Sequence, residues 1–168
     1  TYTFHLRDGI QWSNGEPVKA ADFVYAWLKQ MSADATNGYS FIMTDYIVNG
    51  QEYNEGSVEA SEVGVKAVDD QTLEVQLKSP TPYFLNLTTM DMFFPVNEAF
   101  CEEQGTNFAL SPDTMLYCGP YVITDYDPAV GVTFAKNDNY WDKDNVAIED
   151  AQVRVIKDAA AALIIQIG

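Results

Sequence analysis

The fold is decided near the start of the chain, where residues 1–31 read TYTFHLRDGIQWSNGEPVKAADFVYAWLKQM. The first six residues alternate in polarity, which is the period-two pattern of a half-buried strand. Turn-forming residues occupy 12–17, and from Ala20 onward apolar side chains recur at helical spacing. The segment therefore predicts a strand, a turn and an amphipathic helix, with Asp22 placed in the first turn where an acidic side chain favours the helix dipole.

The rest of the chain continues this mixture of strands and helices. Alternating segments predict two β-hairpins and a later strand, and helical spacing with stop signals predicts three further helices. The hairpins are expected over 63–77 and 121–136, the strand over 153–156, and the helices over 40–53, 83–89 and 97–104. Because a purely parallel sheet supplies no hairpins, the pattern predicts a mixed α/β fold of the α+β kind.

Composition narrows the range of partners. The 168 residues are 47% hydrophobic, which is enough to bury a core, and 25 acidic side chains against 9 basic ones give a formal net charge of -16. Such a charge repels nucleic acid and anionic lipid headgroups, so neither is an expected partner. An excess of carboxylates is typical of a protein that stays soluble outside the cytoplasm.

Catalytic and metal-binding chemistry finds little support. His5 is the only histidine, and its place in an alternating strand predicts a solvent-facing residue rather than a catalytic base. Asp69 and Asp70 stand where a hairpin needs a turn, and the acidic residues within 138–144 lack the Gly and Glu of a calcium loop. No Gly-rich phosphate loop occurs either. We expect no enzyme activity, no metal and no cofactor.

Three further residues remain as candidates. Cys101 and Cys118 lack metal-ligand spacing and leave two alternatives open: free core thiols, or a disulfide that would stabilise the fold by about 3 kcal/mol. Tyr39 follows Gly38 in a polar connection between predicted helices. An aromatic side chain without an evident core role there is a candidate to line a ligand cleft.

Several stretches, taken in order, resemble one family. They are YTFHLR (2–7), WSNGEPV (12–18), GVKAVDD (64–70), TLEV (72–75), PYF (82–84), GPY (119–121) and NYW (139–141). In this order and spacing they resemble the oligopeptide-binding proteins, the family 5 solute-binding components of peptide ABC importers. The resemblance spans nearly the whole chain.

The resemblance implies part of a larger, three-lobed receptor with a periplasmic-binding-protein-like type II fold, in which an extended peptide lies in a cleft that closes by hinge motion. Residues 1–95 would form most of the smaller outer lobe and residues 96–168 part of the sheet-containing lobe. The second major lobe would be missing. The implied function is non-catalytic capture of peptides and their delivery to the membrane permease of an ABC importer. The receptor would be extracytoplasmic, either free in the periplasm or itself a cell-surface lipoprotein.

The resemblance also assigns residues. Tyr39 matches a position where the family sets a lobe tyrosine against the peptide, and Met90 falls near another cleft-facing position. Cys118 stands where the family commonly has Asn, and Lys19 where it often has a Thr helix cap. The apolar segment 159–167 exceeds its counterpart in hydrophobicity and is expected to form a core element. Scaffold roles fall to Trp12, Asn14, Gly15, Asp22 and Trp141.

Other functions stay open at this stage. One alternative is a receptor for another solute, such as a nickel chelate, haem or a sugar, and another is a peptide-signal receptor that works without bulk import. A peptidase conflicts with the missing nucleophile, base and metal ligands. Because one wall of a cleft supplies only part of the backbone partners, we expect the chain alone to bind peptides weakly or not at all.

Overall fold

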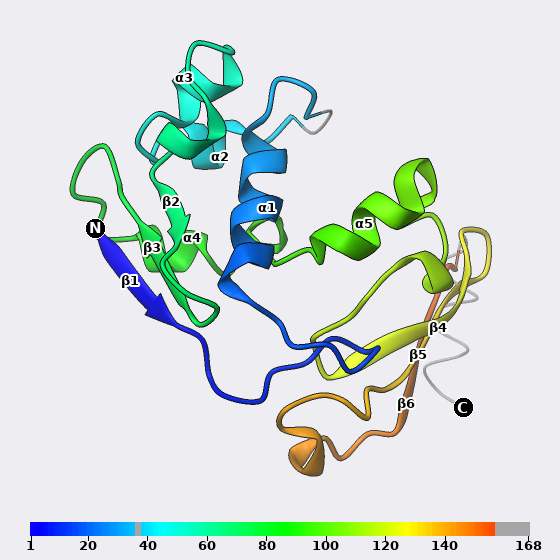
Figure 1. Cartoon of the computed structure of the whole chain (residues 1–168). Helices are drawn as coiled ribbons and strands as arrows, with labels where there is room; N and C mark the ends of the chain where they lie inside the picture. Colours follow the sequence, from blue (N-terminus) through cyan, green and yellow to red (C-terminus); the bar gives the residue numbers. More distant parts are fainter. Residues whose placement is uncertain (36–37, 157–168) are drawn as a thin grey trace. The chain divides into compact units, whose positions relative to one another are not determined.

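Two units make up the part of the chain that the computed structural model describes, residues 1–35 and 38–156 (Figure 1). Unit 1 comprises Thr1–Ile10 and Pro17–Glu103, and unit 2 comprises Gln11–Glu16 and the residues from Gln104 onward. These bounds describe contacts within this chain. The two predicted lobes refer to a larger protein, and they stay a prediction.

Unit 1 contains an antiparallel sheet with strand order β1-β3-β2 and five α-helices. Tyr2 of β1 and Val65 of β2 both pair with Val75 of β3, so the predicted strand and hairpin share one sheet. On β1 the predicted alternation is confirmed, since Tyr2 and Phe4 are partly buried while Thr3 and His5 are exposed. The elements are β1 (Tyr2–His5), α1 (Ala20–Met31), α2 (Phe41–Thr44), α3 (Gly50–Asn54), β2 (Val65–Ala67), β3 (Thr72–Val75), α4 (Phe84–Leu87) and α5 (Glu98–Gln104), with 3-10 turns at Ala60–Glu62 and Asp91–Phe93.

The prediction of a single helix over residues 40–53 was wrong, because the structure has two short helices, α2 and α3, joined by turns that contain one β-bridge residue. Ile47 forms an isolated antiparallel bridge with Leu77. The backbone N–H of Val48 donates to the carbonyl of Gln76 at 2.9 Å. Backbone pairing with the end of the β2-β3 hairpin therefore overrides the local helical spacing.

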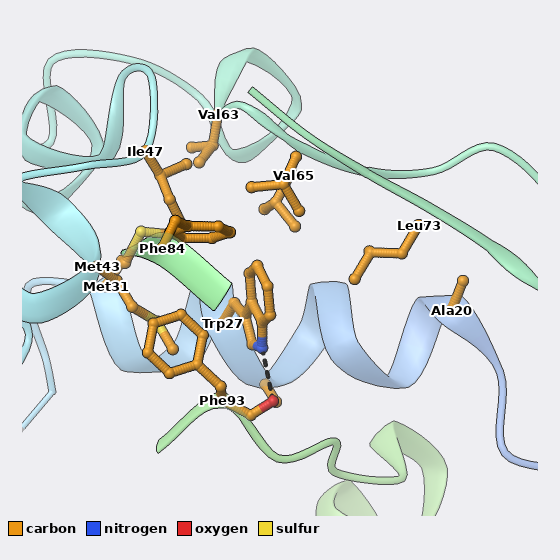
Figure 2. Packing of buried hydrophobic residues seen from close by; sticks show 12 residues of the cluster. Ala20, Trp27, Met31, Met43, Ile47, Val63, Val65, Leu73, Phe84 and Phe93 are labelled. Atoms are coloured by element: carbon orange, nitrogen blue, oxygen red, sulfur yellow. Dashed lines mark hydrogen bonds between the residues drawn. The ribbon is translucent and has the colours of Figure 1, made fainter. Parts of the chain in front are cut away.

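Unit 1 is built around the buried face of α1 (Figure 2). Trp27 is 2% exposed, and its indole Nε1–H donates to the carbonyl of Phe93 at 2.9 Å. The Trp27 and Phe93 rings meet edge to face with centroids 5.1 Å apart, and Phe84 packs edge to face on Phe93 in turn. The core cluster consists of Ala20, Ala26, Trp27, Met31, Met43, Ile47, Val63, Val65, Leu73, Val75, Phe84 and Phe93.

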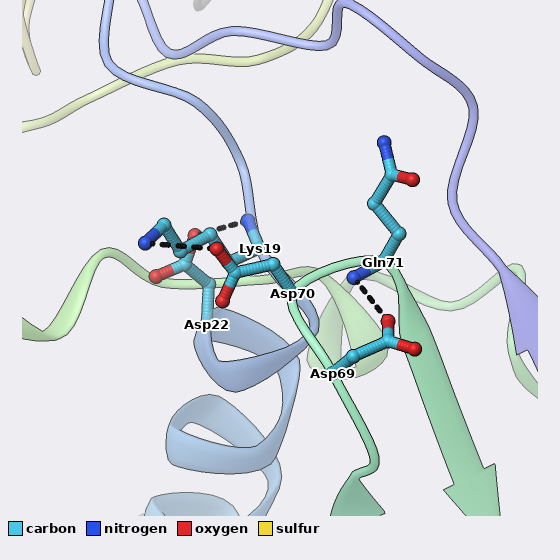
Figure 3. A network of polar contacts seen from close by, with 5 residues as sticks. All are labelled: Lys19, Asp22, Asp69, Asp70 and Gln71. Atoms are coloured by element: carbon cyan, nitrogen blue, oxygen red, sulfur yellow. Dashed lines mark hydrogen bonds and ion pairs between the residues drawn. The ribbon is translucent and has the colours of Figure 1, made fainter.

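The start of α1 is held by Asp22 and by the turn of the β2-β3 hairpin, and not by a side-chain cap at Lys19 (Figure 3). Lys19 supplies no side-chain cap, but its backbone N–H donates to the carboxylate of Asp22 at 2.9 Å. The backbone N–H of Ala20 donates to the carbonyl of Asp70 at 2.8 Å, and the Lys19 ammonium lies 3.2 Å from the Asp70 carboxylate. The turn of the β2-β3 hairpin therefore replaces the side-chain cap that is missing at Lys19.

Unit 2 holds a second antiparallel sheet with strand order β4-β5-β6. Its strands are β4 (Tyr121–Asp127), β5 (Gly131–Lys136) and β6 (Asp150–Arg154), and 3-10 turns cover Gly105–Asn107, Pro112–Thr114 and Lys143–Asn145. The predicted second hairpin is confirmed, whereas the last strand lies nearer the N-terminus than 153–156 because Gly131–Ala135 of β5 pairs with residues 150–154.

The turn near the start of the chain, Gln11–Glu16, belongs to unit 2. The side-chain amide of Asn139 donates to the carbonyl of Ser13 at 2.8 Å, and the backbone N–H of Tyr117 donates to the Ser13 hydroxyl at 3.2 Å. Trp12 is 2% exposed, and Gly15 has a φ of 88°, which favours glycine. The sequence motif around Trp12 therefore anchors residues from the second half of the chain.

Within the described residues, no helix is long and apolar enough to span a membrane. The apolar segment 159–167, expected to form a core element, lies outside the described residues.

We predict that Trp27→Phe lowers the free energy of unfolding by about 1–3 kcal/mol, because the buried carbonyl of Phe93 loses its donor and the smaller ring leaves space. Urea unfolding followed by circular dichroism measures the change. The matched control is Trp141→Phe, because Trp141 is 44% exposed, and there we expect a change within about 0.5 kcal/mol. Equal effects of the two substitutions would contradict the role assigned to the Trp27 indole.

The stability of the fold is expected to depend on pH through the carboxylate of Asp69, which lies in the β2-β3 turn. The backbone N–H of Gln71 donates to the Asp69 carboxylate at 2.8 Å and, together with hydrogen bonds from Thr72, lowers the pKa of Asp69. A lowered pKa contributes stability above the pKa of the unfolded chain, and that stability is lost as pH falls through the folded value. We predict that Asp69→Asn loses less stability than the wild type on acidification, measured by urea midpoints across the acid range. An unchanged acid slope would contradict this assignment.

Candidate ligand-binding site

A surface depression of about 240 Å³ lies in unit 1 and is lined by Gln30, Tyr39, Asp91 and Met92. Gln30 comes from the last turn of α1, and Asp91 and Met92 come from the 3-10 turn Asp91–Phe93. Tyr39 comes from the connection before α2. Two neighbouring segments around residues 30 and 39 thus meet a third, at residues 91 and 92, around one hollow.

The position of the 3-10 turn follows from the core. Phe93 ends this turn, and its ring and carbonyl are both held by Trp27. Gln30 follows Trp27 by three residues on α1 and therefore lies nearly one turn further along the same helix. The contact between Trp27 and Phe93 consequently brings Asp91 and Met92 beside the end of α1.

Tyr39 is exposed in the way that the sequence indicated. Its side chain is 60% exposed, and its ring centroid lies 6.3 Å from that of Phe41, which is 52% exposed. Two neighbouring aromatic side chains on the surface present a large apolar area with a polar tip at Tyr39, which is suited to contact with a ligand. The structure thus brings Tyr39 to a depression without giving it a core role.

Met90 lies next to the depression in sequence but is not among its lining residues. It precedes the 3-10 turn, is 38% exposed, and its carbonyl accepts a hydrogen bond from the Phe93 N–H at 3.0 Å. Its role as a ligand contact stays a prediction. Sequence reasoning missed Gln30, Asp91 and Met92, and the only available signal was the carboxylate of Asp91 inside an otherwise apolar stretch.

The lining groups are an amide, a phenol, a carboxylate and a thioether. Such a set offers hydrogen bonds and apolar contact to a ligand, but it holds no paired base and nucleophile of the kind used in covalent catalysis. The described residues contain no group of three or more His, Cys, Asp or Glu side chains placed to hold a metal ion. His5 is exposed on β1 and does not line this depression.

The two cysteines lie in different units. Cys101 is buried in α5 of unit 1, and Cys118 is partly buried in unit 2. Both carry free thiols in this structure. The alternative of a disulfide between them stays a prediction.

An exposed depression that combines polar groups with one aromatic side chain is a candidate surface for binding a ligand. The sequence pattern of the family described as Bacterial extracellular solute-binding proteins, family 5 Middle, matches residues 1–165. The chain belongs to this family, and the resemblance drawn from its motifs is confirmed.

Individual relatives agree with this membership. The chain is 38% identical over 158 residues to the Oligopeptide-binding protein OppA of Bacillus subtilis, covering 94% of this chain and 29% of that protein. It superposes with a TM-score of 0.94 and 41% identity on the substrate-binding domain of an oligopeptide ABC transporter from Bacillus anthracis, covering 98% of this chain and 32% of that one. For Listeria monocytogenes OppA bound to peptide, the TM-score is 0.92 at 41% identity, with the same shares covered.

These relatives also confirm the predicted fold class, a mixed α/β chain that forms part of a larger substrate-binding fold. The chain spans about three tenths of the length of the relatives it matches.

Proposed function

We propose that this chain is the non-catalytic, ligand-facing part of an extracytoplasmic receptor that captures oligopeptides and delivers them to the membrane permease of an ABC importer. The observation that carries the proposal is the exposed depression at Tyr39 in a chain that superposes, over 98% of its length, on a protein solved with peptide bound. The names of two relatives, an oligopeptide-binding and a dipeptide-binding protein, support peptides as the solute class.

The proposed mode of binding uses the peptide backbone more than its side chains. An extended peptide would pair its backbone polar groups as an added strand does, while its side chains enter roomy, hydrated spaces. Tyr39 and Met90 would contact the peptide from the outer lobe, residues 1–95, and residues 96–168 would belong to the sheet-containing lobe. Such a receptor needs no cofactor, because it works by capture and domain closure.

Two features of the chain fit a location outside the cytoplasm, either free in the periplasm or on a lipid anchor. The family is described as extracellular, and the net charge of -16 favours a soluble protein with no attraction to anionic lipid headgroups. The same charge gives no support to nucleic acid as a partner.

We predict that Tyr39→Ala weakens peptide binding by roughly tenfold, about 1.4 kcal/mol, in the longest natural polypeptide that carries this sequence, because a contacting aromatic surface is removed. Isothermal titration with peptide measures the change. The matched control is Tyr83→Ala: Tyr83 is 50% exposed in the same unit, packs on Tyr46 and does not line the depression. We expect its affinity to equal that of the wild type, and a loss of affinity confined to Tyr83→Ala would argue against the proposed site.

The proposed function as a whole is tested by titrating a mixed pool of di- to hexapeptides into the longer polypeptide and, in parallel, into this chain alone. Strong heat from the former and little from the latter is the expected result, because a single wall of a cleft supplies only part of the partners. If both stay silent, the peptide proposal fails, and the same titration with a nickel chelate, haem and sugars then identifies a different solute.

A further inference from the structure

Four reactive side chains meet between α1 and α5 of unit 1, and none of them lines the depression. Tyr25 and Lys29 lie four residues apart on α1 and so share one face of that helix. Cys101 and Glu102 face them from α5. The Lys29 Nζ lies 3.5 Å from the Cys101 Sγ and 3.0 Å from the Tyr25 hydroxyl oxygen.

Cys101 is the more deeply placed of the two residues that make the nitrogen–sulfur contact. Cys101 is only 3% exposed, whereas the stem of Lys29 starts from an exposed position on α1. The long, flexible lysine side chain therefore reaches inward and directs its nitrogen at a buried sulfur. Two helices thus hold an oxidisable sulfur in contact with an ammonium nitrogen that becomes a nucleophile once it loses a proton.

A hydrogen-bonded chain leads away from the lysine nitrogen. Lys29 donates to the Tyr25 hydroxyl oxygen, and the Tyr25 O–H donates to the Glu102 carboxylate at 2.6 Å. Burial, and then hydrogen bonding to Cys101 and Glu102, raises the pKa of Tyr25 well above its ordinary value. The phenol therefore keeps its proton and can pass one from the ammonium to the carboxylate without becoming charged.

We infer that Cys101 and Lys29 form a modification site: in the presence of hydrogen peroxide they join through a covalent sulfur–nitrogen bond, a sulfenamide crosslink between α5 and α1. The role goes beyond ligand binding and does not rest on it. The geometry that supports it is the nitrogen–sulfur contact together with the proton path through Tyr25 to Glu102.

The reaction balances in two steps. The Cys101 sulfur attacks one oxygen of the peroxide, the O–O bond breaks, and the leaving hydroxide takes the thiol proton to become water. A sulfenic acid remains, so that sulfur is oxidised by two electrons and the peroxide is reduced. The Lys29 ammonium passes one proton through Tyr25 to Glu102, and its free amine attacks the sulfur. The S–N bond forms, the S–O bond breaks, and the leaving hydroxide takes the second nitrogen proton to become water.

The burial of Cys101 sets the order of events. Because Cys101 is buried, peroxide reaches the sulfur when α5, a helix of seven residues, opens locally. When α5 closes again, the sulfenic acid returns to the Lys29 nitrogen and is shielded from further peroxide. Capture by nitrogen protects the sulfur from irreversible oxidation to sulfinic acid. A thiol reductant restores both side chains by attacking the sulfur of the S–N bond.

The test is graded peroxide treatment of the longest natural polypeptide that carries this sequence, followed by tryptic peptide mapping by mass spectrometry. We expect a peptide that joins Lys29 to Cys101, is not cleaved after Lys29, weighs two hydrogens less than the sum of its parts, and disappears on reduction. Cys101 and Cys118 lie in the same tryptic peptide, residues 79–136, so a crosslink from Lys29 to either cysteine would have the same mass. The decisive sample is therefore Cys118→Ser, in which we expect the joined peptide to persist.

Three further variants separate the roles. Cys101→Ser should give no joined peptide, and Lys29→Arg, which keeps the charge but lacks an amine, should give sulfinic acid at Cys101 instead. Tyr25→Phe should slow crosslinking at least about tenfold, because the proton path is broken. Thermal melting of each untreated variant checks that it folds. A Cys118→Ser protein that yields only sulfinic acid at Cys101, or a folded Lys29→Arg protein that oxidises like the wild type, would overturn the inference.

Discussion

The hydrogen bond from the Trp27 indole to the Phe93 carbonyl is the constraint on which unit 1 depends. It joins residues 66 positions apart and is buried, so the carbonyl has no water to replace a lost donor. The same indole presents its faces and edges to the core. The Trp27 side chain therefore both donates to the buried carbonyl of Phe93 and packs against the Phe93 ring. These two contacts fix the segment after α4 against α1.

The sequence predicted elements wherever the determining pattern is local. Alternation over residues 1–6 and helical spacing from Ala20 onward suffice for β1 and α1, because each element buries one face and its period is visible in a short window. The prediction of one helix over residues 40–53 was wrong because Ile47 forms a β-bridge with Leu77, thirty residues away in the chain. Pairing of that kind leaves no periodic trace in the paired segment.

The residues of the candidate site also differ in whether a local sequence pattern could predict them. Tyr39 could be singled out from sequence because a large aromatic side chain in a polar connection has no core to enter. Gln30, Asp91 and Met92 could not, because they meet only through the contact between Trp27 and Phe93. Their residue types are ordinary for a helix end and a turn, and only the tertiary contact brings them together.

Helix α1 has three functions over a short length. Trp27 points into the core, Lys29 reaches Cys101 of α5, and Gln30 lines the depression. Residues three apart share a helix face, so Trp27 and Gln30 both lie toward the 3-10 turn Asp91–Phe93, whereas Lys29 is turned toward α5. A rotation of α1 that spared one contact would misplace the other two. The packing of one amphipathic helix thus positions the core, the cluster around Cys101 and the surface depression together.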